Sequence, residues 1–133
     1  MYIKDECKRL LFFKFRVGVS PLRVETGRYE SCVDVLTGQA RKGLVYECRT
    51  CLCCFRGVEN EQHFLLECPL YEQQRSTLIH AFRAYCSKQR KLVPQQVDQL
   101  FNSVMSCVDK HVIYALANYL WLSFSCRTAF LGN

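Results

Sequence analysis

The sequence predicts a mainly α-helical protein, in which a small helical bundle is joined through a cysteine-rich segment to an irregular, basic N-terminal arm. Three observations lead to this fold class. Segments in the C-terminal half repeat apolar residues at helical spacing, cysteine and histidine crowd into residues 48–71, and residues 30–47 show only weak periodicity. At 133 residues, half of them apolar, the chain has the length of about one domain and enough apolar side chains for a modest core.

The N-terminal part begins with a predicted helix over residues 3–16, which the glycine and proline of residues 18–21 would end. Residues 22–27 are predicted to be a short strand or an extended arm, and residues 30–47 a loop. The helix is predicted from one apolar stripe, which consists of Ile3, Cys7, Leu10 and Leu11.

Three helices are predicted for the C-terminal part. The first follows Pro69, a residue type favoured at the first helical position, and runs to about Ser87. Pro94 opens the second, and the third spans about residues 111–130 and is apolar nearly all round, so it should be central. The apolar positions that predict the first two helices are Tyr71, Leu78, Phe82, Tyr85, Val97, Leu100, Phe101, Val104, Met105 and Val108.

The segment between these parts contains the pattern C-x2-C-x8-H-x4-C, formed by Cys51, Cys54, His63 and Cys68. A C-x2-C pair lets one turn present two thiolates, and the two later residues can close a cage from the other side. Three thiolates and one imidazole fill a tetrahedron and leave no open position, which is typical of a structural site. The sequence therefore predicts a CCHC-type zinc knuckle, whose Zn²⁺ can contribute about 10–16 kcal/mol to folding.

The cysteine run leaves a second ligand frame open. Cys48 and Cys51 also form a C-x2-C pair, so either this pair or Cys51 and Cys54 could join His63 and Cys68. The intervening loop would have eleven or eight residues. Loop-closure entropy favours the shorter loop only slightly, so spacing alone leaves the Cys51 and Cys54 frame modestly favoured.

The cysteine content bears on the redox state of the compartment in which the protein is expected. Ten cysteines are a high count, but the charged N-terminus does not resemble a secretory signal peptide. We therefore expect a reducing, intracellular location, in the nucleus or the cytoplasm. Residues 111–126 lack charge, but a membrane span needs about 20 apolar residues, so we expect a buried helix and no membrane partner. The thiols expected in the core are Cys7, Cys86, Cys107 and Cys126.

The chain is expected to form one compact unit with three parts: a basic helix and arm (1–47), the zinc knuckle (48–71) and a three-helix segment (72–133). The formal net charge is +6. Residues 1–56 hold 11 lysines and arginines against 6 acids, whereas residues 57–133 hold 7 against 6. A basic half suggests an anionic partner, of which nucleic acid is the commonest, although ordinary solubility charge explains the balance about as well.

The residues around the ligands also resemble a known family. Arg49-Thr-Cys-Leu-Cys-Cys54 and the stretch from Val58 to Tyr71, with Arg75, are similar to the carboxy-terminal zinc knuckle of non-LTR (LINE-type) retrotransposon reverse transcriptases. Looser similarity extends over Phe15–Gly18, Leu22–Tyr29 and the tail around Arg127. In that family an arginine stands two residues before the first ligand. Arg49 takes this place here, so the resemblance implies Cys51 and Cys54 as ligands. Asn60 departs from the family's acidic triplet.

The resemblance implies a non-catalytic accessory region that binds RNA or DNA beside a reverse transcriptase body. The chain has no Asp-Asp pair of the kind that holds the metal ions of a polymerase. Phe55 would stack on an unpaired base, whereas Phe64 is expected to pack against the knuckle. The arginines expected to bind nucleic acid are Arg16, Arg23, Arg28, Arg49 and Arg56.

Three alternatives stay open at this stage. The chain could be a structural or protein-docking module, with the metal serving only to attach the arm to the bundle. It could also be a truncated remnant of such an element without independent activity. A metal-dependent hydrolase would need an open coordination position and a base, and the only other histidines, His80 and His111, lie in apolar helical contexts.

Overall fold

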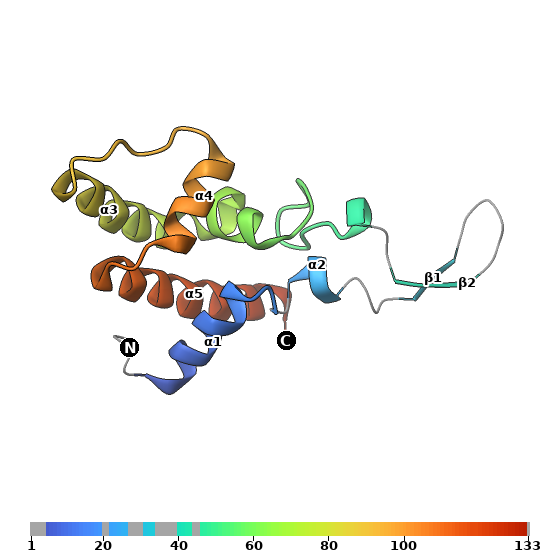
Figure 1. The fold of residues 1–133 in the computed structure, drawn as a ribbon. Coiled ribbons are helices and arrows are strands. Elements are labelled where there is room, and N and C mark those ends of the chain that lie inside the picture. The colour runs from blue at the N-terminus through green and yellow to red at the C-terminus, as the bar shows by residue number, and fades with distance from the viewer. Residues whose placement is uncertain (1–4, 20–21, 27–30, 34–39, 44–45, 133) are drawn as a thin grey trace.

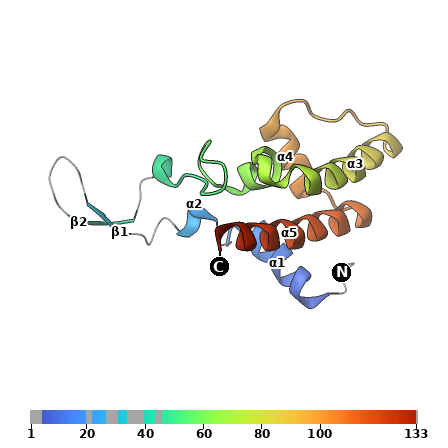
Figure 2. The same ribbon diagram turned by 180° about the vertical axis from the view of Figure 1, so that it is seen from behind.

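The computed structural model describes residues 5–19, 22–26, 31–33, 40–43 and 46–132, and these residues form a mainly helical protein, as the sequence predicts. Helix α5 lies in the middle, with α1 on one side of it and α3 on the other (Figure 1, and from behind in Figure 2). The four main helices are α1 (Glu6–Arg16), α3 (Glu72–Lys88), α4 (Val97–Ser106) and α5 (Lys110–Leu131).

The prediction that the last helix is central is confirmed, because α5 packs against both α1 and α3. Its buried side chains include Leu116, Leu120 and Phe124. The helix is not buried all round, since Tyr114 and Leu122 are more than half exposed. In the part of the chain that the structure describes, no helix combines the length and the apolar character that crossing a bilayer requires.

Local capping residues set the ends of the helices. The Asp5 carboxylate accepts a hydrogen bond from the Lys8 amide and begins α1, and the Asp109 carboxylate accepts from the amides of His111 and Val112 and begins α5. Helix α1 ends at Arg16, and Gly18 follows its cap with a φ of 76°, in the left-handed region that glycine adopts without strain. The expected helix after Pro94 begins three residues later, at Val97.

Two predictions for the N-terminal part are wrong. The segment predicted as a strand or an extended arm contains a short helix, α2 (Arg23–Thr26), because buried Leu22 and a hydrogen bond from the Arg23 amide to Glu59 hold its first turn. The predicted loop contains an antiparallel pair of short strands, β1 (Ser31–Val33) and β2 (Ala40–Lys42). In Figures 1 and 2 this pair extends away from the helices, with no helix over it.

Helix α1 also buries a different face from the predicted stripe. Phe12 and Phe15 are almost fully buried, whereas Leu10 is 55% exposed. The two aromatic rings bury more apolar area than the smaller side chains of the stripe, so they take the core positions. Cys7 is consequently exposed, against the prediction. The other predicted core thiols fit better, since Cys86 and Cys107 are buried and Cys126 is half-buried.

The cap of α5 gives a first prediction. Asp109→Ala removes the acceptor for two amides at the start of the central helix, so the free energy of unfolding should fall by about 1 kcal/mol. Urea denaturation followed by circular dichroism measures the change. Asp98→Ala is the matched control, because Asp98 is exposed and lies in the first turn of α4 without serving as its cap. An equal loss in both variants would contradict the capping role.

Candidate metal centre

Four side chains from the cysteine-rich segment converge on one point. The ligand atoms of Cys51, Cys54, His63 and Cys68 all lie within 4.8 Å of one another. The Cys51 and Cys68 sulfurs are 4.0 Å apart, and the Cys54 sulfur is 3.3 Å from His63 Nε2. These are the four ligands of the predicted frame.

The spacing of these atoms fits one tetrahedral metal ion. Zinc bonds of about 2.3 Å to sulfur and about 2.0 Å to nitrogen would place two sulfurs about 3.8 Å apart, and a sulfur and a nitrogen about 3.5 Å apart. The observed separations of 4.0 and 3.3 Å differ from these values by only a few tenths of an ångström. These two pairs therefore fit a shared metal ion closely, and all four ligand atoms lie near enough to one another to hold one.

A tight turn presents the first two ligands. The Phe55 amide donates to the Cys51 carbonyl over 2.9 Å, and the Cys51 amide donates to the Gly57 carbonyl over 2.8 Å. An antiparallel bridge between Thr50 and Val58 closes the base of this turn. Phe55 has a φ of 58°, in the left-handed region that is unfavourable for a bulky side chain. The chain thus accepts backbone strain at the residue that follows the second ligand.

A π-helical turn, His63–Glu67, presents the other two ligands. Residues five apart on an α-helix point about 140° away from each other, so a regular helix would separate His63 from Cys68. The wider turn, closed by a 2.8 Å hydrogen bond from the Cys68 amide to the His63 carbonyl, brings both to the same side. The Asn60 side chain accepts a hydrogen bond from the His63 amide and fixes the start of this segment. Asn60 therefore has a structural role here.

Neighbouring side chains orient the ligands. His63 Nε2 faces Cys54, while its Nδ1 lies 3.6 Å from the Glu67 carboxylate, the arrangement usual for a metal-binding histidine. Gln62 donates to the other Glu67 oxygen over 3.1 Å. From helix α3, Arg75 donates to the Leu65 and Cys68 carbonyls and so attaches the π-helical turn to the bundle.

Burial favours the neutral form of two of the ligand thiols. Cys51 and Cys68 are fully buried. Burial raises the pKa of Cys68 to about 11, and it raises the pKa of Cys51 as well. A metal ion binds the thiolate, so loading the site must release protons.

A second group of potential ligands, Cys51, Cys53 and Glu59, also lies within 4.8 Å. It fits a metal less well, because it offers only three ligands and the Glu59 carboxylate already accepts two hydrogen bonds from Arg127. The Cys53 sulfur lies 3.7 Å from the Tyr71 hydroxyl, and burial raises the pKa of Cys53. The alternative ligand Cys48 lies outside the side chains that the structure describes, so its frame is not tested by the geometry.

Sequence reasoning did not foresee the ion pair between Glu59 and Arg127. Glu59 is completely buried, and it receives hydrogen bonds of 2.9 and 2.7 Å from the Arg127 guanidinium and one of 2.8 Å from the Arg23 amide. Burial by itself would lower the pKa of Arg127, but the bonds and charge of Glu59 raise it above its ordinary value. The available signal was Arg127 itself, a lone charge in an apolar helix predicted to be central.

The metal centre lies against an aromatic cluster. Phe64, directly after the ligand His63, is fully buried and stacks on Phe124 with ring centroids 4.4 Å apart. Tyr71 and Tyr119 also contact its ring, and the Tyr119 hydroxyl donates to the Phe64 carbonyl. The prediction that Phe64 packs rather than binds a base is confirmed.

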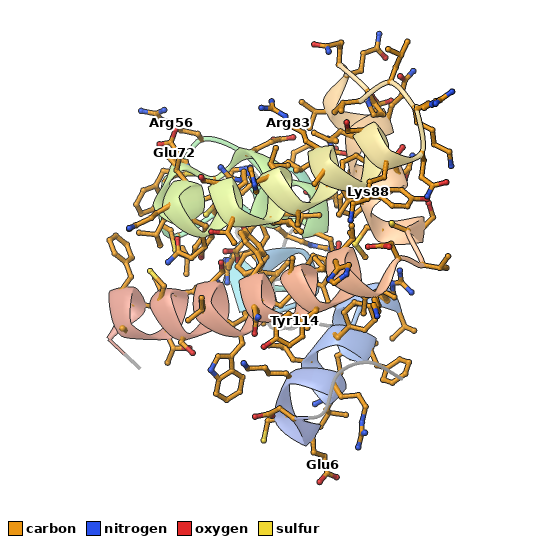
Figure 3. All side chains as sticks on the ribbon, turned by 90° about the vertical axis from the view of Figure 1, so that its left-hand side faces the viewer. Glu6, Arg56, Glu72, Arg83, Lys88 and Tyr114 are labelled. Atoms are coloured by element: carbon orange, nitrogen blue, oxygen red, sulfur yellow. The ribbon has the colours of Figure 1, made fainter. Side chains whose placement is uncertain are left out.

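The residues expected to bind nucleic acid differ in how exposed they are. Phe55 is 70% exposed, Arg56 is exposed, and Figure 3 shows Arg56 pointing away from the helices. Arg49 and Arg23 are half-buried beside the metal turn. Arg16 is half-buried, donates to the Cys107 carbonyl over 3.1 Å and lies over the Phe12 ring. Arg28 lies outside the described residues.

The chain matches no family model, no curated protein and no solved structure in comparisons with known proteins. The resemblance to retrotransposon reverse transcriptases therefore stays a prediction.

The ion pair gives the second prediction. Glu59→Gln should lower the free energy of unfolding by about 3–5 kcal/mol, because it leaves the Arg127 charge buried without its partner. Urea denaturation of the metal-loaded protein measures the loss. Glu72→Gln is the matched control, since Glu72 is an exposed glutamate at the start of α3, where Figure 3 labels it. A loss below about 1 kcal/mol would show that water reaches the pair.

Metal content gives the third prediction. Wild-type protein purified with zinc should carry one metal ion per chain in native mass spectrometry, and Cys54→Ser should lose it because a hydroxyl is a poor ligand for zinc. Cys48→Ser should retain the ion. Loss of metal from the Cys48 variant with retention in the Cys54 variant would instead assign the alternative frame.

Proposed function

We propose that this chain is a non-catalytic, zinc-stapled module that binds single-stranded RNA or DNA at its metal turn. The observation that carries the proposal is Phe55, a large aromatic side chain that the turn holds 70% exposed in a left-handed backbone conformation. Aromatic side chains presented in this way stack on unpaired bases, which all offer a π-face.

The strain at Phe55 supports a binding role. A left-handed conformation costs a non-glycine residue about 1–2 kcal/mol, and glycine would remove the cost. The ring recovers little of this cost through packing, because it is mostly exposed. Because the Phe55 side chain contributes little to the fold, we infer that the strain is retained for a contact that this side chain makes with a ligand.

Charge near the turn supports an anionic ligand. Arg56 is exposed directly beside Phe55, and Arg49 lies at the base of the same turn. The first 56 residues carry most of the positive charge of the chain. Arg16 contributes less to this proposal than to the fold, because its guanidinium contacts Cys107 and Phe12. The proposal therefore rests on Phe55 and Arg56, with Arg23 and Arg49 as neighbouring cations.

The ligand set supports zinc in a structural role. Soft thiolates with one imidazole in a tetrahedral arrangement suit Zn²⁺, and four protein ligands leave no position for a reacting water. We therefore propose no enzymatic activity. The resemblance to the end of a retrotransposon reverse transcriptase would make the module an intracellular accessory region beside such a polymerase.

The fourth prediction separates binding from stability. Phe55→Gly should weaken binding of a fluorescein-labelled single-stranded RNA by about 1–3 kcal/mol, because one stacking contact is lost. The same substitution should raise the free energy of unfolding by about 1 kcal/mol, because the left-handed strain is released. Fluorescence anisotropy and urea denaturation measure the two effects, with single-stranded DNA as a parallel probe.

Two further variants complete this experiment. Arg56→Ala should lower the slope of log affinity against log salt by about 0.7, the value for one phosphate contact on a single strand. Leu92→Gly is the control. Leu92 is also a large exposed apolar residue, with 94% of its surface accessible, but it lies in the connection between α3 and α4 and not in the metal turn. The proposal fails if wild-type protein shows no salt-dependent binding, or if Phe55→Gly binds as tightly as wild type.

A further inference from the structure

A second surface of the molecule, formed by residues of α1 and α5, has the features of a docking groove. Helices α1 and α5 pack side by side, as all three views show, and two hollows lie along their junction. One has a volume of about 440 Å³ and the other about 250 Å³. Leu11 and Trp121 line both, so the two hollows are neighbours.

The walls of this groove are mainly apolar. Leu10 and Lys14 complete the smaller hollow with Cys7, and Phe124 and Ala129 line the larger one. Leu10 is 55% exposed and Trp121 is 40% exposed. Large apolar side chains gathered around a concave surface are typical of a protein-binding site rather than of an ordinary solvated face.

The charge around the groove identifies the kind of partner. Of the basic residues of α1, Lys14 lies at the groove, whereas Lys8 donates to Asn118 and Arg16 donates to the Cys107 carbonyl. Helix α5 carries no acidic residue. Lys14 lies in the wall of the smaller hollow, and among the described residues no carboxylate lines either hollow. A partner that fills the groove therefore gains from negative charge beside its apolar anchors.

The arrangement of the two hollows indicates which kind of partner fits the groove. Two neighbouring hollows can receive two side chains from one helix when these are three or four residues apart, because such side chains lie about 5–6 Å from each other. A bilayer surface offers no side chains at a fixed spacing to fill two neighbouring hollows, and a second copy of the chain would bring two Lys14 ammonium groups together. We infer that the groove between α1 and α5 binds an acidic amphipathic helix of a partner protein, through two large apolar side chains one turn apart.

The chain provides its own reporter for this binding. Trp121 is the only tryptophan, and it lines both hollows. Helical peptides would be selected from a displayed library on the zinc-loaded wild-type chain and counter-selected on Leu10→Glu. The selected peptides should be net negative, with two large apolar residues at i and i+3 or i+4, and should shift Trp121 emission to shorter wavelength.

Matched variants localise the effect. Leu10→Glu should weaken the selected peptides about tenfold, because it places a carboxylate at the mouth of the hollow. Lys14→Glu should weaken them about two- to fivefold. Leu92→Glu changes an exposed leucine outside the groove and should leave affinity unchanged. Both groove positions are at the surface, so these variants keep the fold, which circular dichroism verifies.

Several results would overturn the inference. Selection that yields no groove-dependent binder, or that yields positively charged peptides, would do so. So would phosphatidylserine vesicles that shift Trp121 more strongly than the peptides, or dimerisation in sedimentation that Leu10→Glu abolishes. Loss of RNA binding in Phe55→Gly leaves this inference intact, because Phe55 lines neither hollow.

Discussion

The carboxylate of Glu59 is the point at which three separate stretches of the chain meet. It accepts two hydrogen bonds from Arg127 near the end of the central helix and one from the amide of Arg23 in the N-terminal part, and it lies 3.7 Å from the sulfur of Cys51. A completely buried charge is tolerable only when its partners are in place. One side chain therefore couples the positions of the metal turn, the arm and the last helix. Displacing one of them would remove hydrogen bonds from the buried Glu59 carboxylate.

The metal centre and this ion pair act at different ranges. A metal bound by Cys51, Cys54, His63 and Cys68 would close only a short stretch of sequence, so it organises the turn and the π-helical segment locally. The ion pair joins residues 68 positions apart and attaches this organised segment to the bundle. Phe64 adds apolar contact with Phe124 at the same junction. The segment with the four candidate ligands is thus attached to the bundle by polar and apolar contacts, while Phe55 at its outer turn is exposed.

This division leaves the molecule with two different surfaces. The metal turn presents Phe55 and Arg56, a stacking side chain and a cation, which suit a flexible polyanion. The junction of α1 and α5 presents a concave apolar groove around Trp121, which suits a folded helix. Because the two surfaces use different residues, the effects of variants in the two surfaces should be independent.

Local rules in the sequence were enough to determine the helical class and the approximate span of each main helix, because periodicity and capping act over a few residues. Ligand spacing predicted Cys51, Cys54, His63 and Cys68 as candidates, but it left Cys48 open as an alternative. Tertiary structure alone decided which face of α1 is buried, that residues 23–26 form a helical turn, and that Arg127 finds Glu59. Those outcomes depend on which distant side chains arrive at the same place. Apolar patterning predicts that a position is buried, but it does not predict which residue packs against it.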